Sequence, residues 1–471
     1  MNGAERRQPG TPESKRSAVV LGAGVCGLRA ALTFARAGWS VCVIEREAWV
    51  GGLAASPRSG GNPQDFGVHM LHGFDEELRD DLVQLMGEEA VEVPLNAEIR
   101  WRGRAFRYPL KFSDLLVSLS FMEMLGGVCG LAWTGLRNRV RPPPEPSNAE
   151  EALIQLYGTH LYRLFFESFT HRYWARHPRE LSATFIKSKM PRLSAIDAVR
   201  RFLRRCGLPI PAPKVESALD DEILVYSRRG SSALPEAIAR EIIRLGGQIS
   251  TAATVQTIHF AGQEVRQVSL TEGDGAVSTW SVDALVSTIP PAAFVEYCQP
   301  APPASVSAAV QALQYRPMVV YAVLLDRGPV TGCLYTYFRE RRFHRVSEPR
   351  NAGLRVSPDG ATLLLFEVMC ERGDAFWEGH ESAWTQIIEE ARTEKLLPPE
   401  ATLLHRDILR NAEAYPVFRQ GFEPNWEAFR AWVKRCPNLR SVGRQGGFSY
   451  PNMHTAMRQG EEAANSLIEG E

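Results

Sequence analysis

The sequence has no surplus of charge of either sign. Its 471 residues include 54 lysines and arginines and 54 aspartates and glutamates, so the formal net charge at pH 7 is zero. A neutral chain has no overall field that would attract a polyanion, and we therefore expect no nucleic acid as a partner. At roughly 100–200 residues per domain, the length predicts two or three domains, each large enough to bury a core.

Paired cysteines and several catalytic signatures are also missing. The eight cysteines lie far apart, none forms a Cys-x-x-Cys pair, and no secretory signal precedes the first apolar strand. We therefore expect reduced thiols in a cytoplasmic protein. The absence of a Gly-x-Ser-x-Gly elbow and of histidine or cysteine clusters with metal spacing disfavours a serine hydrolase and a metal site. Residues 1–16 are polar without an apolar period, which predicts a disordered leader.

One segment, 115–136, is apolar enough to be compared with a membrane span. It carries Glu123 in its middle, followed by Gly126 and Gly127, and a charge inside a bilayer is costly. We expect a buried or amphipathic helix pair of a substrate domain. Peripheral membrane contact is the alternative and is not favoured. No pattern in the sequence points to a particular oligomeric state.

The sequence does contain the order of elements typical of a dinucleotide site. Residues 17–21 form a short apolar run, as a buried parallel strand should. The turn Gly22-Ala-Gly24-Val-Cys-Gly27 follows, then a predicted helix over 28–37 that Gly38 closes. A second apolar run over 41–44 leads directly into Glu45.

Each residue type in this order has a physical role. Gly22 permits a tight turn, Gly24 lets the backbone approach a pyrophosphate, and Gly27 lets the helix sit close on the strand. The N-terminus of the helix offers free N–H groups and a positive dipole end to phosphates. Glu45 lies where a carboxylate accepts hydrogen bonds from ribose hydroxyls, and an acid there disfavours the 2′-phosphate of NADP.

Two further segments distinguish FAD from NAD. A second glycine turn, Gly51-Gly52-Leu53, follows soon after Glu45-Arg46, and Asp65-Phe-Gly-Val-His69-Met70-Leu-His72 comes next. Here the sequence resembles the flavoprotein superfamily of amine oxidases, protoporphyrinogen oxidases, phytoene desaturases and UDP-galactopyranose mutases. In that superfamily these segments line the adenosine and the flavin, so the resemblance implies FAD as cofactor.

Other blocks of the superfamily appear in order along the chain. Three segments each resemble one block: Phe169–Trp174 together with 178–183, Arg229–Leu234, and the strand and turn over 284–290. The run from Asn438 to Met453 resembles the C-terminal flavin-binding block. The helix predicted over 455–468 should point its N-terminus at the flavin ring, where its dipole stabilises negative charge on the reduced flavin.

The resemblance implies an α/β fold with two discontinuous domains. A Rossmann-type, three-layer (GR2-like) FAD-binding domain would comprise 17–75, 215–300 and 405–471. A mixed α+β substrate domain would comprise 76–214 and 301–404. The active site is then expected at the junction of the two, where a small-molecule substrate binds.

Within the superfamily, the chain is most similar to the UDP-galactopyranose mutase-like branch, whose members are associated with polysaccharide synthesis. The segment 66–72 resembles that branch's Gly-x-His-x-Phe-His, and 343–348 resembles a segment whose arginine, here Arg345, grips the substrate diphosphate. A second diphosphate-binding arginine of the branch, fourteen residues after its tryptophan, is replaced here by Ser188 when counted from Trp174. A substrate-touching tyrosine is replaced by Val368. A serine hydroxyl does not replace a bidentate arginine fork.

Three hypotheses remain. The leading one is an FAD-dependent oxidoreductase, a dehydrogenase or oxidase of a small organic substrate in polysaccharide or secondary-metabolite biosynthesis. The second is a redox-neutral flavin-dependent mutase or isomerase of a nucleotide sugar. The third is a flavin-binding partner protein without catalysis, which a fold alone does not exclude.

The candidate site residues follow from the motifs and the resemblance. The residues expected to act on the substrate are His69, Arg345 and Tyr450, with a hydrogen-bonded core histidine and a salt-bridged arginine as the alternatives for the first two. The residues expected to hold FAD are Gly22, Gly24, Gly27, Glu45, Arg46, Gly51, Gly52, Leu53, His69, Met70, Val255, Gly443, Arg444, Asn452 and Met453.

Overall fold

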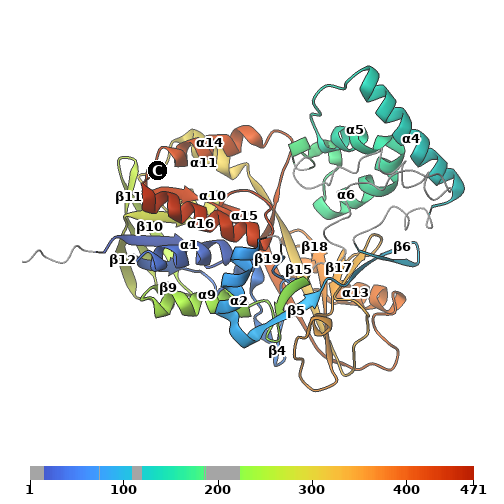
Figure 1. Cartoon of the computed structure of the whole chain (residues 1–471), viewed down its shortest axis with the longest axis horizontal. Helices are drawn as coiled ribbons and strands as arrows, with labels where there is room; N and C mark the ends of the chain where they lie inside the picture. The colour runs from blue at the N-terminus through green and yellow to red at the C-terminus, as the bar shows by residue number, and fades with distance from the viewer. Residues whose placement is uncertain (1–14, 74, 109–118, 185, 187–222, 471) are drawn as a thin grey trace, which may run out of the picture.

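The computed structural model describes residues 15–73, 75–108, 119–184, 186 and 223–470 (Figure 1). The expected disordered leader lies outside these residues except for its last two, and Ser188 lies outside them as well.

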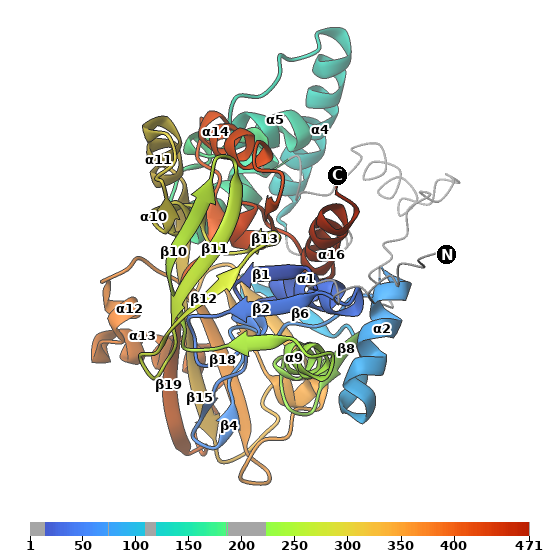
Figure 2. The ribbon, with the colours of Figure 1, turned by 90° about the vertical axis from the view of Figure 1, so that its left-hand side faces the viewer.

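A parallel sheet of five strands holds the N-terminal motif. Its order is β20-β13-β1-β2-β9, and its strands come from three distant stretches of the chain that lie side by side (Figure 2). The members are β1 (Ser17–Leu21), β2 (Ser40–Ile44), β9 (Gln248–Ser250), β13 (Ala284–Ser287) and β20 (Leu439–Ser441). The central strands read as apolar runs because both faces of the sheet are covered. The first strand has the expected bounds.

One face of this sheet is covered by helices and the other by a second sheet. The helices are α1 (Val25–Arg36), α2 (Glu76–Met86), α9 (Ala233–Arg244) and α16 (Met453–Glu469). The opposite face packs against β10 (Thr254–Ala261), β11 (Glu264–Thr271), β12 (Val277–Ser281) and β14 (Cys298–Gln299), with α10 (Pro291–Glu296), α11 (Ala304–Gln311) and α14 (Glu423–Lys434) beside them. The helix α1 begins three residues earlier than expected, because Gly24 is its N-cap.

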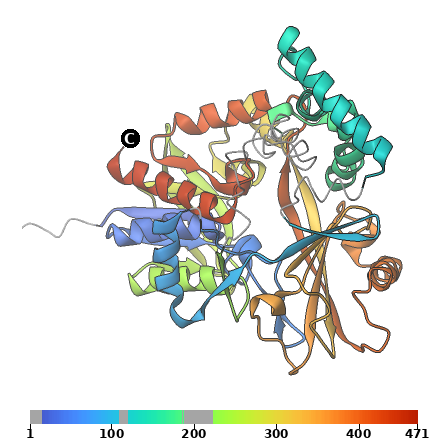
Figure 3. The same ribbon diagram turned by 45° about the vertical axis from the view of Figure 1, so that its right-hand side comes forward.

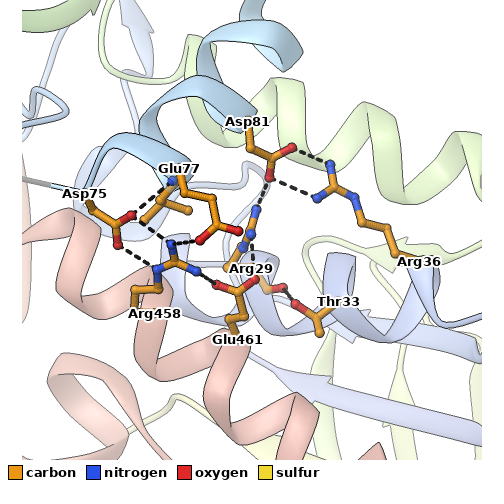
Figure 4. Close-up of polar contacts among 9 residues, drawn as sticks. Arg29, Thr33, Arg36, Asp75, Glu77, Asp81, Arg458 and Glu461 are labelled. Carbon is orange, nitrogen blue, oxygen red and sulfur yellow. Dashed lines mark hydrogen bonds and ion pairs between the residues drawn. The ribbon is translucent and has the colours of Figure 1, made fainter. Parts of the chain in front are cut away.

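Helices α1 and α16 pack closely against each other although they lie at opposite ends of the sequence. A Cβ at Gly460 would meet the Cys26 carbonyl oxygen at 2.1 Å, so only glycine permits this close approach. The buried Arg29 of α1 bridges Asp81 of α2 and, at 2.7 Å, Glu461 of α16 (Figure 4). The N-terminal turns of α1 are therefore held in a fixed position against the middle of α16.

A larger, mainly antiparallel sheet forms the other half of the molecule (Figure 3). Its order is β19-β15-β18-β17-β16-β6-β7. The strands are β19 (Leu403–Val417), β15 (Gln314–Leu325), β18 (Thr362–Met369), β17 (Arg345–Ser347), β16 (Tyr335–Phe338), β6 (Ala97–Trp101) and β7 (Arg104–Arg107). Helices α12 (Ala375–Glu378) and α13 (Glu381–Thr393) cover one face. Two small pairs, β3 (Arg58–Ser59) with β4 (Asn62–Pro63) and β5 (Ala90–Pro94) with β8 (Ile223–Ser227), complete the sheets.

A helical part with α4 (Phe121–Val140), α5 (Ala149–Leu161) and α6 (Ser168–Trp174) lies at the edge of the molecule (Figure 1). Of the two expected possibilities, a buried or an amphipathic helix pair, α4 pairs with α5 but is not buried on its outer face, where Trp133 is 67% and Val140 is 78% exposed. Among the described residues, the helices lack the combination of length and hydrophobicity that a bilayer crossing requires.

The α/β class expected from the sequence is confirmed. The observed strand pairing differs from the expected domain boundaries at two places. Residues 405–417, expected in the FAD-binding domain, belong to β19 and pair with β15 in the larger sheet. The boundary at 405 therefore cuts through a strand. The strand β8, expected in the FAD-binding domain, pairs with β5 of the expected substrate domain. The division into two domains stays a prediction.

Candidate functional site

The N-terminal glycine turn opens onto a large cavity. Its volume of about 630 Å³ lies within the range of roughly 300–1,000 Å³ for small-molecule sites. The walls come from the carboxyl ends of β1 and β2, from β19 and from the C-terminal block. The expected cofactor residues that line it are Gly22, Gly24, Glu45, Arg46, Gly51, Gly52, Leu53, His69, Val255, Arg444, Asn452 and Met453.

The three glycines of the first turn have different surroundings. A Cβ at Gly27 would lie 2.0 Å from the Gly22 carbonyl oxygen, so this position must lack a side chain for α1 to pack on β1. Gly22 has a φ of +94°, which favours glycine. A Cβ at Gly24 would have no atom within 4 Å, although Gly24 lines the cavity at the N-terminus of α1. This open cradle of backbone N–H groups fits the pyrophosphate of a dinucleotide.

Glu45 connects the acidic strand end to the turn. Its Oε2 accepts a hydrogen bond from the Ala23 N–H at 2.7 Å, and its Oε1 accepts one from the Glu47 N–H at 3.0 Å. A carboxylate has about four acceptor sites, so both oxygens can still accept from ribose hydroxyls. Arg46 reaches in another direction and pairs with Glu413 of β19 at 3.1 Å.

One wall of the cavity contains none of the residues that the sequence motifs predict. Residues 407–413 of β19, together with Trp377, line it. They carry no glycine motif, and only the pairing of β19 with β15 places them there.

His69 lines the cavity with a neutral ring. Its Nδ1 lies 2.6 Å from the Gly67 carbonyl oxygen, which can only accept, so Nδ1 carries the proton and Nε2 is an acceptor. Burial, followed by the charges of Arg444 and Arg345, lowers the pKa of His69 to about 4. At neutral pH this side chain can accept a hydrogen bond from a ligand, but it is a weak base.

Asp65, which opens the same motif, organises the segment from outside the cavity lining. Its buried carboxylate accepts hydrogen bonds from Ser56 Oγ, from Tyr226 Oη at 2.6 Å, and from the N–H and Oγ of Ser231 at 3.1 and 2.8 Å. Because Ser231 Oγ is also 3.0 Å from the His69 N–H, this network fixes the backbone that presents His69.

A group of aromatic side chains, here called the tyrosine cluster, lies beside the C-terminal block. Tyr450 meets Tyr415 edge to face at 4.9 Å between ring centroids, and Tyr173 lies 6.0 Å from Tyr415. The Arg444 guanidinium lies over the rings of Tyr415 and Tyr450 at 5.3 and 5.0 Å. Burial raises the pKa of both Tyr173 and Tyr450, so these phenols stay protonated and can donate hydrogen bonds. Tyr173 and Tyr415 were not predicted.

Tyr450 faces a second, more open cavity of about 820 Å³. The helix α14 and the C-terminal block line it, and Pro451 and Asn452 line both cavities. Tyr450 thus precedes directly the two residues that the cavities share, whereas Tyr173 and Tyr415 lie behind it and line neither cavity.

Arg345 is salt-bridged and mostly buried rather than free, with 19% of its side chain exposed. Its Nε and Nη2 bond to the two carboxylate oxygens of Glu367 at 2.6 and 2.9 Å, and these residues face each other across β17 and β18. Glu367 is fully buried. Burial alone raises its pKa, but Arg345 and then His344 lower the pKa to about 2. The pair is therefore ionised, with two of the arginine's donors already used.

Five predicted residues lie outside the lining of the first cavity: Gly27, Met70, Arg345, Gly443 and Tyr450. Met70 is buried in the core against the larger sheet. Gly443, with a φ of +84°, packs against Cys26 of α1, where a Cβ would lie 3.0 Å from its Sγ. Gly27 packs against β1, Arg345 is paired with Glu367, and Tyr450 lines the second cavity. Direct cofactor contact is thus unsupported for Met70 and Gly443, which act through packing.

One group of side chains has the geometry of metal ligands. Ligand atoms of Glu150, Glu167 and His177 lie within 4.8 Å of one another. However, Glu150 is ion-paired with Arg179, and the His177 ring accepts the Arg179 N–H at 3.3 Å. These partners account for the cluster, and we assign no metal to it.

The model of the flavin-containing amine oxidoreductase family matches residues 25–468, and the chain belongs to this family. It is an FAD-dependent oxidoreductase, and the prediction of FAD as cofactor is confirmed.

The similar proteins include both a mutase and an oxidase. A protein of Klebsiella pneumoniae described as a probable UDP-galactopyranose mutase is 23% identical over 187 residues, which span 37% of this chain and 45% of that protein. A reduced UDP-galactopyranose mutase structure has a TM-score of 0.78 at 19% identity and covers 97% of this chain and 94% of its own. A putrescine oxidase bound to putrescine has a TM-score of 0.64 at 16% identity, with 97% and 99% covered. These structural likenesses establish the fold, and they include both an oxidase and a mutase.

Proposed function

We propose that this protein is an FAD-dependent dehydrogenase or oxidase that takes a hydride equivalent from a small organic substrate at the tyrosine cluster. FAD, when bound, supplies the two-electron acceptor. The chain's own residues bind and orient both partners. The open cradle at Gly24 would hold the pyrophosphate, Glu45 the adenosine ribose, and the N-terminus of α16 at Asn452 and Met453 would face the flavin ring.

Substrate orientation would come from the cluster and from His69. The protonated phenol of Tyr450, whose hydroxyl is hydrogen-bonded to that of Tyr173, would donate a hydrogen bond, and neutral His69 would accept one through Nε2. Arg444 adds a positive charge, since no ion pair among the described residues involves it. This charge disfavours a cationic substrate and favours a neutral or anionic one.

The observation that carries the proposal is the buried Arg345–Glu367 pair. A redox-neutral sugar transfer must grip a diphosphate rigidly while the sugar leaves, which calls for arginine forks. Here the fork of Arg345 is turned onto Glu367 at 2.6 and 2.9 Å, and the pair carries no net charge. With this fork engaged by a carboxylate, the site favours net oxidation of a less charged substrate.

A nucleotide-sugar mutase is the second candidate. The uncompensated charge of Arg444, whose Nη2 donates only to the Pro451 carbonyl oxygen at 3.0 Å in the described part of the chain, favours it. The likeness to the UDP-galactopyranose mutase structure supports it as well.

Anaerobic bleaching of the flavin tests the proposed role of the cluster. Candidate alcohols, amines and sugars are mixed with the holoenzyme, and the flavin absorbance at about 450 nm is followed. With a substrate that bleaches the wild type, Tyr450→Ala should keep its flavin but bleach at least about tenfold more slowly, because the substrate loses its orientation.

The matched variant Tyr450→Phe separates two roles of the residue. It keeps the ring against Tyr415 and removes only the hydroxyl donor. Its rate of flavin bleaching should therefore lie between the rates of the wild type and of Tyr450→Ala. Equal bleaching rates in wild type and Tyr450→Ala, at full flavin content, would place the substrate elsewhere.

A further inference from the structure

The outer face of α4 carries a continuous apolar stripe. Within the helix, six large side chains are exposed by 45–78%. We call them the α4 stripe: Phe121, Met122, Leu125, Trp133, Leu136 and Val140. They fall within an arc of about 120° when successive residues are spaced about 100° around the helix.

The inner face of α4 has the opposite character. A Cβ at Gly126 would lie 2.9 Å from the His160 ring of α5, and one at Gly127 would lie 2.9 Å from Leu161 Cδ2. Glycines thus bring α4 close to α5, while the large apolar side chains point away from the protein. A helix that served only its own core would show the reverse pattern. Because α4 lies at the outer edge of the molecule (Figures 1 and 3), the stripe is suited to an external apolar partner.

Positive charge flanks the stripe at its C-terminal end. Arg137, Arg139 and Arg141 are exposed. In the part of the chain that the structure describes, none of these three takes part in an ion pair.

Positive charge also flanks the N-terminal end of the stripe. The hairpin of β6 and β7 carries Arg102, Arg104 and Arg107, all exposed. Glu123, the acidic residue of α4, is held by Arg102 through two bonds of 3.0 and 2.9 Å. The charges of Arg102 and Glu123 therefore cancel, the positive charge at this end comes from Arg104 and Arg107, and both ends of the stripe are basic.

We propose that the α4 stripe docks on an anionic membrane surface, with α4 lying in the plane of the interface. Its apolar side chains would enter the boundary between headgroups and acyl chains, while the flanking arginines contact anionic headgroups. A second copy of the chain fits less well. An antiparallel pair would set Arg137 and Arg139 against the basic hairpin, and a parallel pair would set them against themselves. Peripheral contact, the less favoured alternative in the sequence, is thus the one that the structure supports.

Vesicle co-sedimentation with the full-length holoenzyme tests this proposal. The protein should sediment with vesicles of equal parts phosphatidylcholine and phosphatidylserine, and much less with phosphatidylcholine alone. Trp133→Asp/Leu136→Asp should weaken binding at least about tenfold, because charges would enter the acyl boundary. Arg137→Gln/Arg139→Gln should weaken it by roughly tenfold or more, with a smaller salt dependence than the wild type.

Two control variants carry the same kinds of substitution, an apolar residue to aspartate and an arginine to glutamine, at exposed sites away from α4. Val277→Asp on β12, where the valine is 70% exposed, and Arg430→Gln on α14 should bind vesicles like the wild type. Flavin content reports folding of every variant.

Four results would overturn the proposal. The first is vesicle binding that Trp133→Asp/Leu136→Asp leaves unchanged, and the second is the absence of vesicle binding at low salt. Another is a dimer in solution that the same variant converts to a monomer, since a second copy would then cover the stripe. The last is slow alkylation of Cys129, an exposed thiol on this face, without vesicles, since the chain itself would then cover it.

Discussion

Replacing Gly24 with leucine is expected to give a folded protein without bound flavin. The φ of Gly24 is −67°, which any residue adopts, and a Cβ there would meet no atom within 4 Å. The backbone therefore tolerates the change, but the side chain would fill the space that we assign to the pyrophosphate. We expect flavin affinity to fall by at least about a hundredfold, or about 3 kcal/mol, measured from the absorbance of bound flavin after purification and from titration with FAD.

Gly332→Leu is the matched control. Gly332 also has open space at its Cβ and no positive φ, but it does not line the cavity. This variant should remain yellow with a full complement of flavin. A Gly24→Leu protein that is equally yellow would show that the cofactor is held elsewhere.

Glu367→Ala should destabilise the protein by about 3–5 kcal/mol, the usual cost of removing one partner of a buried ion pair. The glutamate is fully buried, and its loss leaves the charge of Arg345 without compensation. Urea unfolding followed by tryptophan fluorescence measures the loss. Glu381→Ala removes an exposed partner of Arg406 and should cost no more than about 1 kcal/mol.

The same pair predicts a dependence of stability on pH. The folded-state pKa of Glu367, about 2, lies below the value of about 4.3 for an unperturbed glutamate. Its contribution to stability is therefore fully present above the unfolded pKa and is lost as the pH falls toward the folded pKa. The stability difference between wild type and Glu367→Gln should narrow on acidification below about pH 4. A difference that stays constant to pH 3 or so would contradict an ionised Glu367.

Local patterns predicted the parts of the molecule that are local in origin. The turn from Gly22 to Gly27 sits between a strand and a helix because its glycines meet steric demands set by their immediate neighbours. The acidic end of the second strand follows from the same unit. These features depend on a short stretch of chain, so sequence alone could place them and indicate the cofactor.

Features that depend on pairing between distant strands could not be placed in this way. The resemblance predicts that Arg345 binds an anion, with a salt-bridged arginine as the alternative, and the register of β17 on β18 sets it opposite Glu367. Nothing in the segment around Arg345 reveals that register. The wall formed by 407–413 depends likewise on the pairing of β19 with β15.

For the helix α4 the sequence left two possibilities open, a buried or an amphipathic helix. Its apolar content did not decide between them, because hydrophobicity does not say which face of a helix packs inward. The glycines at 126, 127 and 130 were the available signal, since they mark the face that approaches α5.

The most direct test of the central claim, net oxidation by an FAD enzyme, is the stoichiometry of electron acceptor to product. With a substrate that bleaches the flavin, acceptor consumption and product formation are measured in the same reaction, with oxygen or a dye as acceptor. The proposal predicts one two-electron equivalent of acceptor reduced for each product molecule formed. Product that forms only with pre-reduced flavin, while no acceptor is consumed, would contradict net oxidation and support the redox-neutral mutase instead.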